Sequence, residues 1–181
     1  TYKKDVLATF NTTRLKQGSI FMQLHIPGFV NRDYSIVNAP ATFEAPKPYH
    51  KLATPTLVIR NKGAAWNNPF VVVFEPYNAK EKPTIKSVTK LTENNIYKGL
   101  KIESRLSSRN KITQYVITQS KGGVFANQAL GLYFKGTYAV VTLNKKDKSL
   151  KSIYVGEGEE LRFKDQVIKT DSNKSFFKNY N

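Results

Sequence analysis

Cysteine is absent from the 181 residues of the chain, and histidine occurs only twice, at His25 and His50. Without cysteine, disulfide bonds, cysteine-bound zinc sites and thiol nucleophiles are excluded. Two histidines so far apart, with no third ligand suggested near either, do not indicate a metal site. We therefore expect neither a metal nor any other cofactor. The lack of cysteine suits a periplasmic or surface protein and a cytosolic one equally, so it assigns no compartment.

Long apolar runs are missing as well. The longest, Phe70 to Phe74, has five residues and suits a strand, whereas a membrane-spanning helix needs ~18–20. The chain opens at Thr1, without an initiator methionine and without the charged and apolar segments of a signal peptide. We expect no membrane span, and we expect the chain to be a processed or excised piece of a longer protein.

Acidic residues are scarce relative to basic ones, with 13 Asp and Glu against 29 Lys and Arg, which gives a formal net charge of +16. Residues that build a core are plentiful, since 40% of the chain is apolar and 22 residues are aromatic. A folded domain is therefore expected, not a disordered basic tail. The charge exceeds the ~2–8 that solubility favours in a small domain, which indicates a polyanionic partner.

Alternation of apolar and polar residues, with turn-forming residues between the runs, dominates the sequence, and no window has the periodicity of an amphipathic helix. This pattern predicts an all-β fold, specifically a two-layer antiparallel β-sandwich of roughly 12 or more strands. The expected strands are 5–10, 19–26, 34–37, 55–60, 70–75, 85–91, 96–103, 112–119, 130–135, 137–143, 150–155, 160–163 and 166–169.

Proline divides the chain into two parts of different character. All eight prolines lie within residues 1–83, while residues 84–181 contain none and carry 18 of the 29 basic residues. We expect loops and edge strands in the first part and a regular meander in the second, whose alternating lysines face water. No linker separates the parts, so a single domain over 1–181 is predicted. Turns are expected at Lys135–Gly136 and at the acidic run 157–160.

No motif for a serine nucleophile, a phosphate-binding loop or a zinc protease is present. The best constellation lies around His25, which is followed by Asn31, Arg32 and Tyr34. An imidazole, a guanidinium and a phenol together suit the binding or protonation of an acidic sugar, which makes His25 and Tyr34 candidate catalytic residues and Asn31 and Arg32 candidate substrate-binding residues. Alternatively, His25 ends a strand and bonds to the backbone.

Trp66 is the only tryptophan and lies among Gly, Ala and Asn residues, with Arg60 shortly before it. An exposed indole can stack on the apolar face of a sugar, so Trp66 and Arg60 are further substrate-binding candidates. Alternatively, Trp66 anchors a loop or fills the core.

Nucleic acid is the other polyanion that cations and aromatic rings could bind. However, the sequence has no RNA-recognition signature, zinc finger or recognition helix, and its basic residues are dispersed over many predicted strands. Nucleic acid is therefore not the expected partner.

The segments 54–60, 63–70, 73–77 and 85–88, together with 26–28, 31–32, 39–40 and 153–158, carry a family resemblance, whose specific part is 54–77. They resemble the C-terminal sheet domain of heparinase II/III-like polysaccharide lyases. The resemblance implies a secreted enzyme, periplasmic or extracellular, in which an N-terminal α/α toroid packs on a β region. In that family a Tyr or His starts β-elimination of a uronate-containing polysaccharide.

The chain lacks the toroid and the histidine-bearing segment that carries the chemistry in that family. The resemblance therefore implies an inactive piece of a polysaccharide lyase, with the toroid of the same polypeptide and an acidic polysaccharide as its partners. The alternative is a freestanding carbohydrate-binding or surface-adhesion module without lyase activity.

Overall fold

The computed structural model describes residues 4–14, 18–41, 44, 46–47, 49–64, 68–171 and 174–180. Thirteen strands and two short 3-10 helices are present in these ranges, and all strand pairs found there are antiparallel. In the described part of the chain, no helix has the length and apolar character needed to cross a membrane. The predicted all-β sandwich is confirmed.

The chain divides into two compact units, which we describe separately. The first contains Thr1–Asp5 and Gly28–Phe70, and the second contains Val6–Pro27 and Val71–Asn181. The single domain expected over 1–181 stays a prediction.

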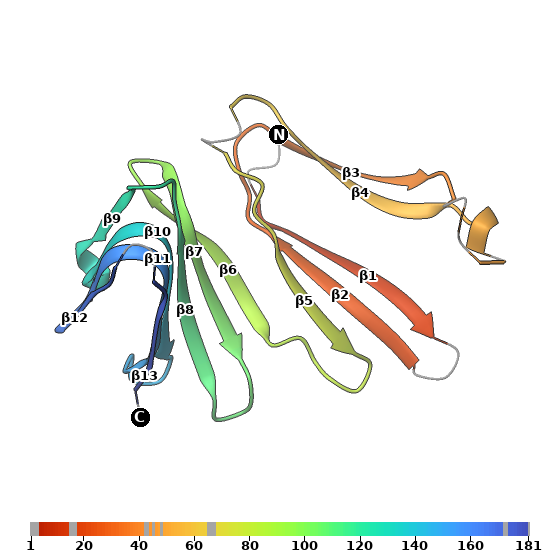
Figure 1. The fold of residues 1–181 in the computed structure, drawn as a ribbon. Helices are drawn as coiled ribbons and strands as arrows, with labels where there is room; N and C mark the ends of the chain where they lie inside the picture. Colours follow the sequence, from red (N-terminus) through yellow and green to blue (C-terminus); the bar gives the residue numbers. More distant parts are fainter. Residues whose placement is uncertain are drawn as a thin grey trace. The chain divides into compact units, whose positions relative to one another are not determined.

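The first unit is built on one hairpin, formed by β3 (Arg32–Ala39) and β4 (Thr54–Asn61), with the 3-10 helix η1 (Tyr49–Lys51) in the connection (Figure 1). Tyr34 lies opposite Ile59, and Ile36 lies opposite Leu57, so one face of the ribbon is apolar. Pro55 is tolerated in β4 because the described ribbon has only two strands, which leaves outer edges that need no donor.

The second unit begins with a three-stranded sheet of β1 (Val6–Arg14), β2 (Gly18–Ile26) and β5 (Val73–Asn78), in the order β1-β2-β5. β5 contains Pro76 and lies at an edge of this sheet, as expected for a strand that lacks one backbone donor. It starts three residues later than predicted, because Phe70 still belongs to the first unit, where its ring lies against the Arg32 guanidinium.

The larger sheet of the second unit has eight strands. Six follow the order β12-β11-β10-β8-β7-β6, while β9 pairs with β10 and β13 pairs with β11 (Figure 1). The 3-10 helix η2 (Gln128–Leu130) precedes β10. The strands are β6 (Ile85–Glu93), β7 (Ile96–Arg105), β8 (Lys111–Thr118), β9 (Val124–Asn127), β10 (Leu132–Asn144), β11 (Leu150–Phe163), β12 (Gln166–Lys169) and β13 (Phe176–Asn179).

Two hydrophobic clusters stabilise the second unit. The main core includes Phe134, Val141 and Ile153, each with no exposed surface, and it lies among the strands of the larger sheet. The second cluster contains Val88, Leu100 and Ile102, against which Val73 of β5 packs. Burial of apolar surface in these clusters is the main favourable term in folding, and the second cluster joins the smaller sheet to the larger one.

The turns expected at Lys135–Gly136 and at 157–160 are wrong, because both segments lie inside the long strands β10 and β11. Gly136 has φ 155°, and a Cβ atom on it would lie 2.4 Å from Cα of Gly158. These glycines therefore permit a close, bulged approach of two strands and do not form turns. In the acidic run, Glu159 forms an ion pair with Lys135, and Glu160 forms one with Arg162, two residues later in the same strand.

Candidate functional site

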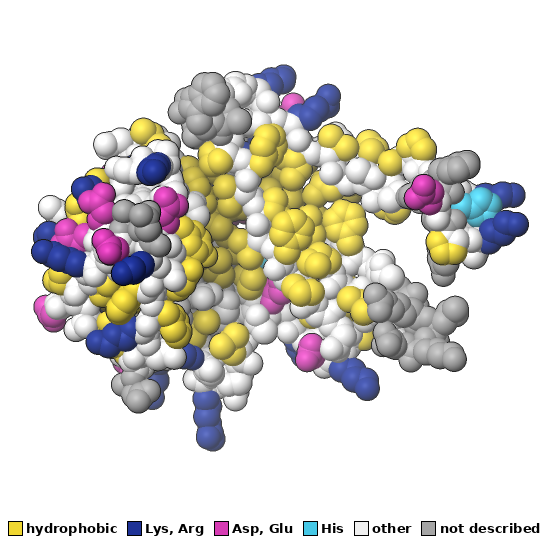
Figure 2. All heavy atoms as spheres, viewed as in Figure 1, with side chains coloured by type: hydrophobic (Ala, Val, Ile, Leu, Met, Phe, Trp, Pro, Cys, Tyr) yellow, Lys and Arg dark blue, Asp and Glu magenta, His cyan; other side chains and the backbone are white. Residues whose placement is uncertain are grey.

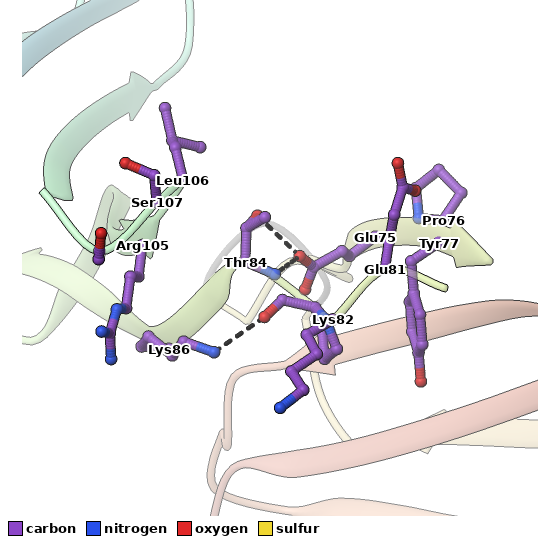
Figure 3. Close-up of a pocket in the computed structure, with 12 residues that line it drawn as sticks. Glu75, Pro76, Tyr77, Glu81, Lys82, Thr84, Lys86, Arg105, Leu106 and Ser107 are labelled. Atoms are coloured by element: carbon purple, nitrogen blue, oxygen red, sulfur yellow. Dashed lines mark hydrogen bonds between the residues drawn. The ribbon is translucent and has the colours of Figure 1, made fainter. Parts of the chain in front are cut away.

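A cationic cleft in the second unit is the best candidate site. We call it the β5–β6 cleft, and it lies where β5, the connection to β6 and the β7–β8 turn meet (Figure 3). Its volume is about 710 Å³. The residues on which its chemistry depends are Glu75, Tyr77, Lys82, Lys86, Arg105 and Ser107.

Glu75 of β5 connects several segments that line the cleft or lie next to it. Its side chain is buried, and its Oε1 atom accepts hydrogen bonds from the Thr84 amide, the Thr84 hydroxyl at 2.8 Å and the Ile85 amide at 3.0 Å. Its Oε2 atom lies 3.1 Å from Nε2 of His25. The carboxylate therefore ties β5 to β2 and to the start of β6 (Figure 3).

The hydrogen bonds also fix the charge of Glu75. Burial on its own raises the pKa of this carboxyl, but the donors from Ile85, Thr84 and His25 outweigh burial, and the pKa falls below its usual value. Glu75 is thus a carboxylate at neutral pH, engaged by several donors. Its role is to position the cleft, since a carboxyl in this state is a poor proton donor.

Three exposed cations border the cleft. Arg105 is positioned by its own amide, which donates to the Thr84 carbonyl at 2.8 Å, while Lys86 Nζ donates to the Pro83 carbonyl at 2.8 Å. Lys82 is exposed in the same connection. In Figure 3, Arg105, Lys86 and Lys82 follow one another from the left to the centre of the view. With the exposed Glu81 and the buried Glu75 as the opposing charges, the lining carries a surplus of one positive charge.

Tyr77 adds an aromatic surface to the cationic lining. Its ring stacks on Phe21 of β2, with the centroids 5.0 Å apart and the planes at 11°. Phe21 and Tyr77 face each other in neighbouring strands, and the pair fixes the orientation of the phenol. Cations, a serine hydroxyl and a fixed aromatic ring form a lining suited to an anionic sugar.

His25 lies behind this cleft. Its side chain is only 12% exposed and contacts the carboxylate of Glu75. The alternative prediction, that His25 hydrogen-bonds to the backbone, therefore leaves out its contact with the Glu75 side chain of β5. His25 orients Glu75, and a catalytic role for His25 stays a prediction.

Four other predicted residues, Asn31, Arg32, Tyr34 and Arg60, belong to the first unit, but Arg60 pairs with Asp33 and so faces the opposite side of the hairpin from Arg32 and Tyr34. Arg32 is fully buried, and its Nη2 atom donates to the carbonyls of Asn68 at 3.1 Å and Pro69 at 2.9 Å. Its guanidinium also stacks 4.3 Å from the Phe29 ring centre. Arg32 thus anchors the loop before β5, and direct contact between Arg32 and substrate stays a prediction.

The remaining predicted residues differ in exposure. Asn31 is exposed with φ 64°, and Arg60 is exposed opposite Asp33. Burial raises the pKa of Tyr34, which keeps its phenol protonated and works against its use as a base.

His25 and Tyr34 belong to different units, so neither unit assembles the proposed acid/base pair by itself. Trp66 lies outside the described residues. The substrate-binding roles assigned to Asn31, Arg60 and Trp66 stay predictions.

Elsewhere, basic residues are dispersed. On the face drawn in Figure 2, Lys and Arg side chains alternate with Asp and Glu over β9–β13, where Lys135 pairs with Glu159 and Arg162 with Glu160. The described residues contain no group of three or more side chains able to hold a metal ion. The positive charge of the described residues is therefore spread over many strands and is not gathered on one of them.

Comparison with known proteins places the second unit in a family. The model of the endo-acting ulvan lyase C-terminal domain matches residues 85–180, more than half of the chain. The chain belongs to this family. An endo-acting ulvan lyase of Formosa agariphila is 32% identical over 176 residues, which are 97% of this chain and 21% of that protein. The chain thus spans about a fifth of this curated relative, and no solved structure matches it.

Membership of the ulvan lyase C-terminal domain family confirms the coarser part of the sequence-based resemblance, the C-terminal domain of a polysaccharide lyase. The matched range covers the whole eight-stranded sheet and includes Lys86 and Arg105 of the cleft.

Sequence reasoning missed Tyr77, Lys82, Lys86 and Arg105 as site residues. Lys86 was visible only as one of the alternating lysines expected to face water, which it does. The sequence signal that could have indicated this site is the pair Lys82 and Lys86, which flank Pro83 and Thr84 where the proline-rich part ends and the meander begins. The contribution of the β7–β8 turn depends on tertiary contacts and has no local signature.

Proposed function

We propose that this chain is an accessory β-sandwich domain of a secreted polysaccharide lyase and that its β5–β6 cleft holds an acidic, uronate-containing polysaccharide. The main support for this proposal is that Lys82, Lys86 and Arg105 all line one cleft. The chain also belongs to the family of the endo-acting ulvan lyase C-terminal domain. Because the similar protein is an endo-acting ulvan lyase, ulvan is the first substrate to test.

The chemistry of the cleft supports this assignment. The planar guanidinium of Arg105 suits the two oxygens of a uronate carboxylate, and the lysines add point charges along the chain. Tyr77 offers an aromatic ring to the apolar face of a sugar. Such binding depends on exposed charges and weakens as salt screens them.

For the whole enzyme, we propose a heparinase II/III-like arrangement in which an N-terminal α/α toroid carries the catalytic groups. We place the protein in the periplasm or outside the cell. The relative is about five times as long as the aligned segment, which leaves ample chain for such a domain. Sequencing of the upstream reading frame tests this part: several hundred residues of toroid helices support it, and a short or unrelated upstream region contradicts it.

Affinity electrophoresis or calorimetry with ulvan tests the binding role. The domain is expected to bind ulvan at low salt, and the double substitution Lys86→Ala with Arg105→Ala is expected to weaken binding roughly tenfold, the effect of losing two charged contacts. Lys121→Ala, which removes an exposed charge outside the cleft, serves as the matched control. Absence of binding by the unmodified domain, or equal affinity of the double variant, refutes the proposal.

A further inference from the structure

The two faces of the β3–β4 hairpin differ in polarity. Tyr34 lies opposite Ile59, and Ile36 lies opposite Leu57, so these four side chains share one face, which we call the apolar hairpin face. The other face mixes charged, polar and apolar residues, namely Asp33, Ser35, Val37, Thr56, Val58 and Arg60. Ile36 is 80% exposed, more than any other large apolar side chain of the described residues. The apolar hairpin face is therefore open at its middle.

A ribbon of two strands is a weak structure without a partner. The sheet of the first unit has only two strands in the described part of the chain (Figure 1). Isolated hairpins are marginally stable in water and need further strands or a packing partner on their apolar side. Both hydrophobic clusters of the described residues consist of residues of the second unit. Burial of the apolar hairpin face against another surface would therefore add stability that the first unit lacks.

Three buried polar side chains lie at one end of the same face. Arg32 and Asn61 are opposite each other in the hairpin, and Tyr34 is the next residue of β3 on this face. Nε and Nη1 of Arg32, the Tyr34 hydroxyl and Oδ1 of Asn61 are buried and form no hydrogen bond. The Arg32 charge lies close enough to Tyr34 to oppose the rise in the pKa of Tyr34 that burial causes. Because buried polar groups are nearly always paired in native proteins, this set of atoms is suited to receive a partner group.

The charge of Arg32 has no counter-ion within the chain. All 13 Asp and Glu residues belong to the described part, and none of them forms an ion pair with Arg32. Asp5, which acts on the pKa of Tyr34, accepts a hydrogen bond from the Gly28 amide at 2.8 Å instead. A buried charge without a counter-ion is costly. The unpaired donors therefore favour a carboxylate, with which a guanidinium forms its strongest hydrogen bonds.

The surroundings of Arg32 favour a protein carboxylate over a sugar carboxylate. Arg32 is fully buried, and the neighbouring surface carries the apolar side chains of Ile36, Leu57 and Ile59. The hydroxyl groups of a sugar would lose their hydrogen bonds to water on such a surface without gaining others. A protein surface supplies apolar groups and a carboxylate together, and protein interfaces are enriched in arginine and aromatic residues, as this face is.

We propose that the apolar hairpin face docks on the part of the lyase polypeptide outside this chain, and that a carboxylate side chain of that part pairs with Arg32. This inference rests on the proposed function, in which the chain is one domain of a longer lyase. The hairpin lies inside the segment aligned with the ulvan lyase of Formosa agariphila, which is 21% of that protein, so most of that polypeptide is available as a partner. The excess of 29 basic over 13 acidic residues also favours an acidic partner surface.

Hydrogen–deuterium exchange tests the docking in the 181-residue chain and in the polypeptide of the complete natural reading frame. We expect the amides of residues 34–37 and 57–59 to exchange roughly tenfold more slowly in the complete polypeptide, because docking opposes local opening of the hairpin. The amides of β8, in the second unit, serve as the internal reference and are expected to exchange equally in both proteins.

Two substitutions in β3 form a matched pair. Ile36→Asp places a charge on the apolar hairpin face and is expected to return the hairpin of the complete polypeptide to the exchange rate of the 181-residue chain. Val37→Asp changes the next residue, which is 42% exposed on the opposite face, and is expected to keep the protection. Both side chains are exposed, so neither change is expected to unfold the 181-residue chain, which circular dichroism verifies.

Arg32→Met tests the carboxylate contact separately. It removes the charge but keeps a long, unbranched apolar side chain. In the complete polypeptide it is expected to reduce the protection of the hairpin roughly tenfold, the effect of losing a central interface arginine. In the 181-residue chain it is expected to change hairpin exchange much less, since Arg32 has no counter-ion there. Full protection in Arg32→Met, with loss in Ile36→Asp, overturns the carboxylate contact.

Other outcomes overturn the docking itself. Equal hairpin exchange in the 181-residue chain and in the complete polypeptide refutes it, and so does full protection in Ile36→Asp. Sedimentation that shows a dimer of the 181-residue chain, dissociated by Ile36→Asp, assigns the apolar hairpin face to a second copy instead. Protection of the hairpin of the 181-residue chain by ulvan assigns the face to the polysaccharide instead.

The failure of the proposed function has a different signature. A natural reading frame that adds no further domain contradicts the arrangement of the whole enzyme and the docking together. Absence of ulvan binding contradicts the role of the β5–β6 cleft but leaves a protected hairpin as support for the docking. If the complete polypeptide binds ulvan through Lys86 and Arg105 but leaves the hairpin unprotected, the proposed function stands and only this inference is overturned.

Discussion

The proline-rich residues 1–83 and the proline-free residues 84–181 build sheets of very different width. The first part forms two- and three-stranded sheets whose strands β4 and β5 contain Pro55 and Pro76, whereas the second forms a sheet of eight strands. A proline removes a ladder donor, so strands that contain it remain at edges. Where proline is absent, strand can add to strand, and the eight strands enclose the main apolar core, which includes Phe134 and Ile153.

The two parts also use their cations differently. Arg32 of the first part is buried and donates to the backbone carbonyls of Asn68 and Pro69. Lys86 and Arg105 of the second part remain exposed at the rim of a cleft. A basic residue in the sequence therefore indicates a binding site for an anion only when its side chain is exposed in the structure.

The largest expected effect contrasts two phenylalanines. Phe134→Ala in β10 removes a side chain with no exposed surface and is expected to lower the free energy of unfolding by about 4 kcal/mol. Phe74→Ala in β5 removes a ring that is 60% exposed and is expected to cost about 0.5 kcal/mol. Urea denaturation followed by circular dichroism measures both. Similar losses contradict the view that stability is concentrated in the eight-stranded sheet.

A smaller effect is expected at the junction of the two parts. Glu75→Gln replaces a buried carboxylate that accepts several hydrogen bonds and is expected to cost about 2 kcal/mol at pH 7. The pKa of Glu75 is lowered in the folded state, so its stabilisation is present above its usual value of 4.5 and is lost as the pH falls through the folded pKa. Denaturation between pH 7 and 3 should show a weaker acid dependence in the variant; an unchanged dependence contradicts this role.

The smallest effect is expected at Glu103 of β7, whose carboxylate pairs with Lys101 and Lys145. Glu103→Gln removes two partly exposed ion pairs, worth about 1 kcal/mol together at pH 7. Since the pKa of Glu103 is about 2 when folded and 4.5 ordinarily, this contribution is lost as the pH falls across that interval. Glu157→Gln, at an exposed carboxylate of β11, is the control and should change thermal stability very little. Equal shifts in melting temperature for the two variants would show that the bridge adds no stability.

The sequence predicted the fold class and most strands because the alternation of apolar and polar residues is strong, and β12 lies at the predicted bounds. The prediction failed where a residue type that is common in turns occurs inside a strand. Gly136 and Gly158 resemble turn residues, yet here they let β10 and β11 approach closely. The strands β9 and β13 were missed, whereas β12, which also has four residues, follows a Lys164–Asp165 turn that marks where it begins.

The site was less predictable than the fold. His25 was correctly placed at the end of a strand, but its contact with Glu75 joins residues fifty positions apart. The β5–β6 cleft unites the connection around Thr84 with Arg105, through a backbone bond between distant segments. Patterns of neighbouring residues carry no information about such contacts, because they depend on the order of strands in the sheet.

Amide-resolved NMR titration of the domain with ulvan fragments tests most directly which part of the chain holds the polysaccharide. We predict shift changes concentrated at Thr84, Lys86 and Arg105–Ser108, which line the β5–β6 cleft, and their decrease as salt is added. Shift changes confined to the β3–β4 hairpin, around Asn31, Tyr34 and Arg60, would contradict the assignment of binding to the cleft.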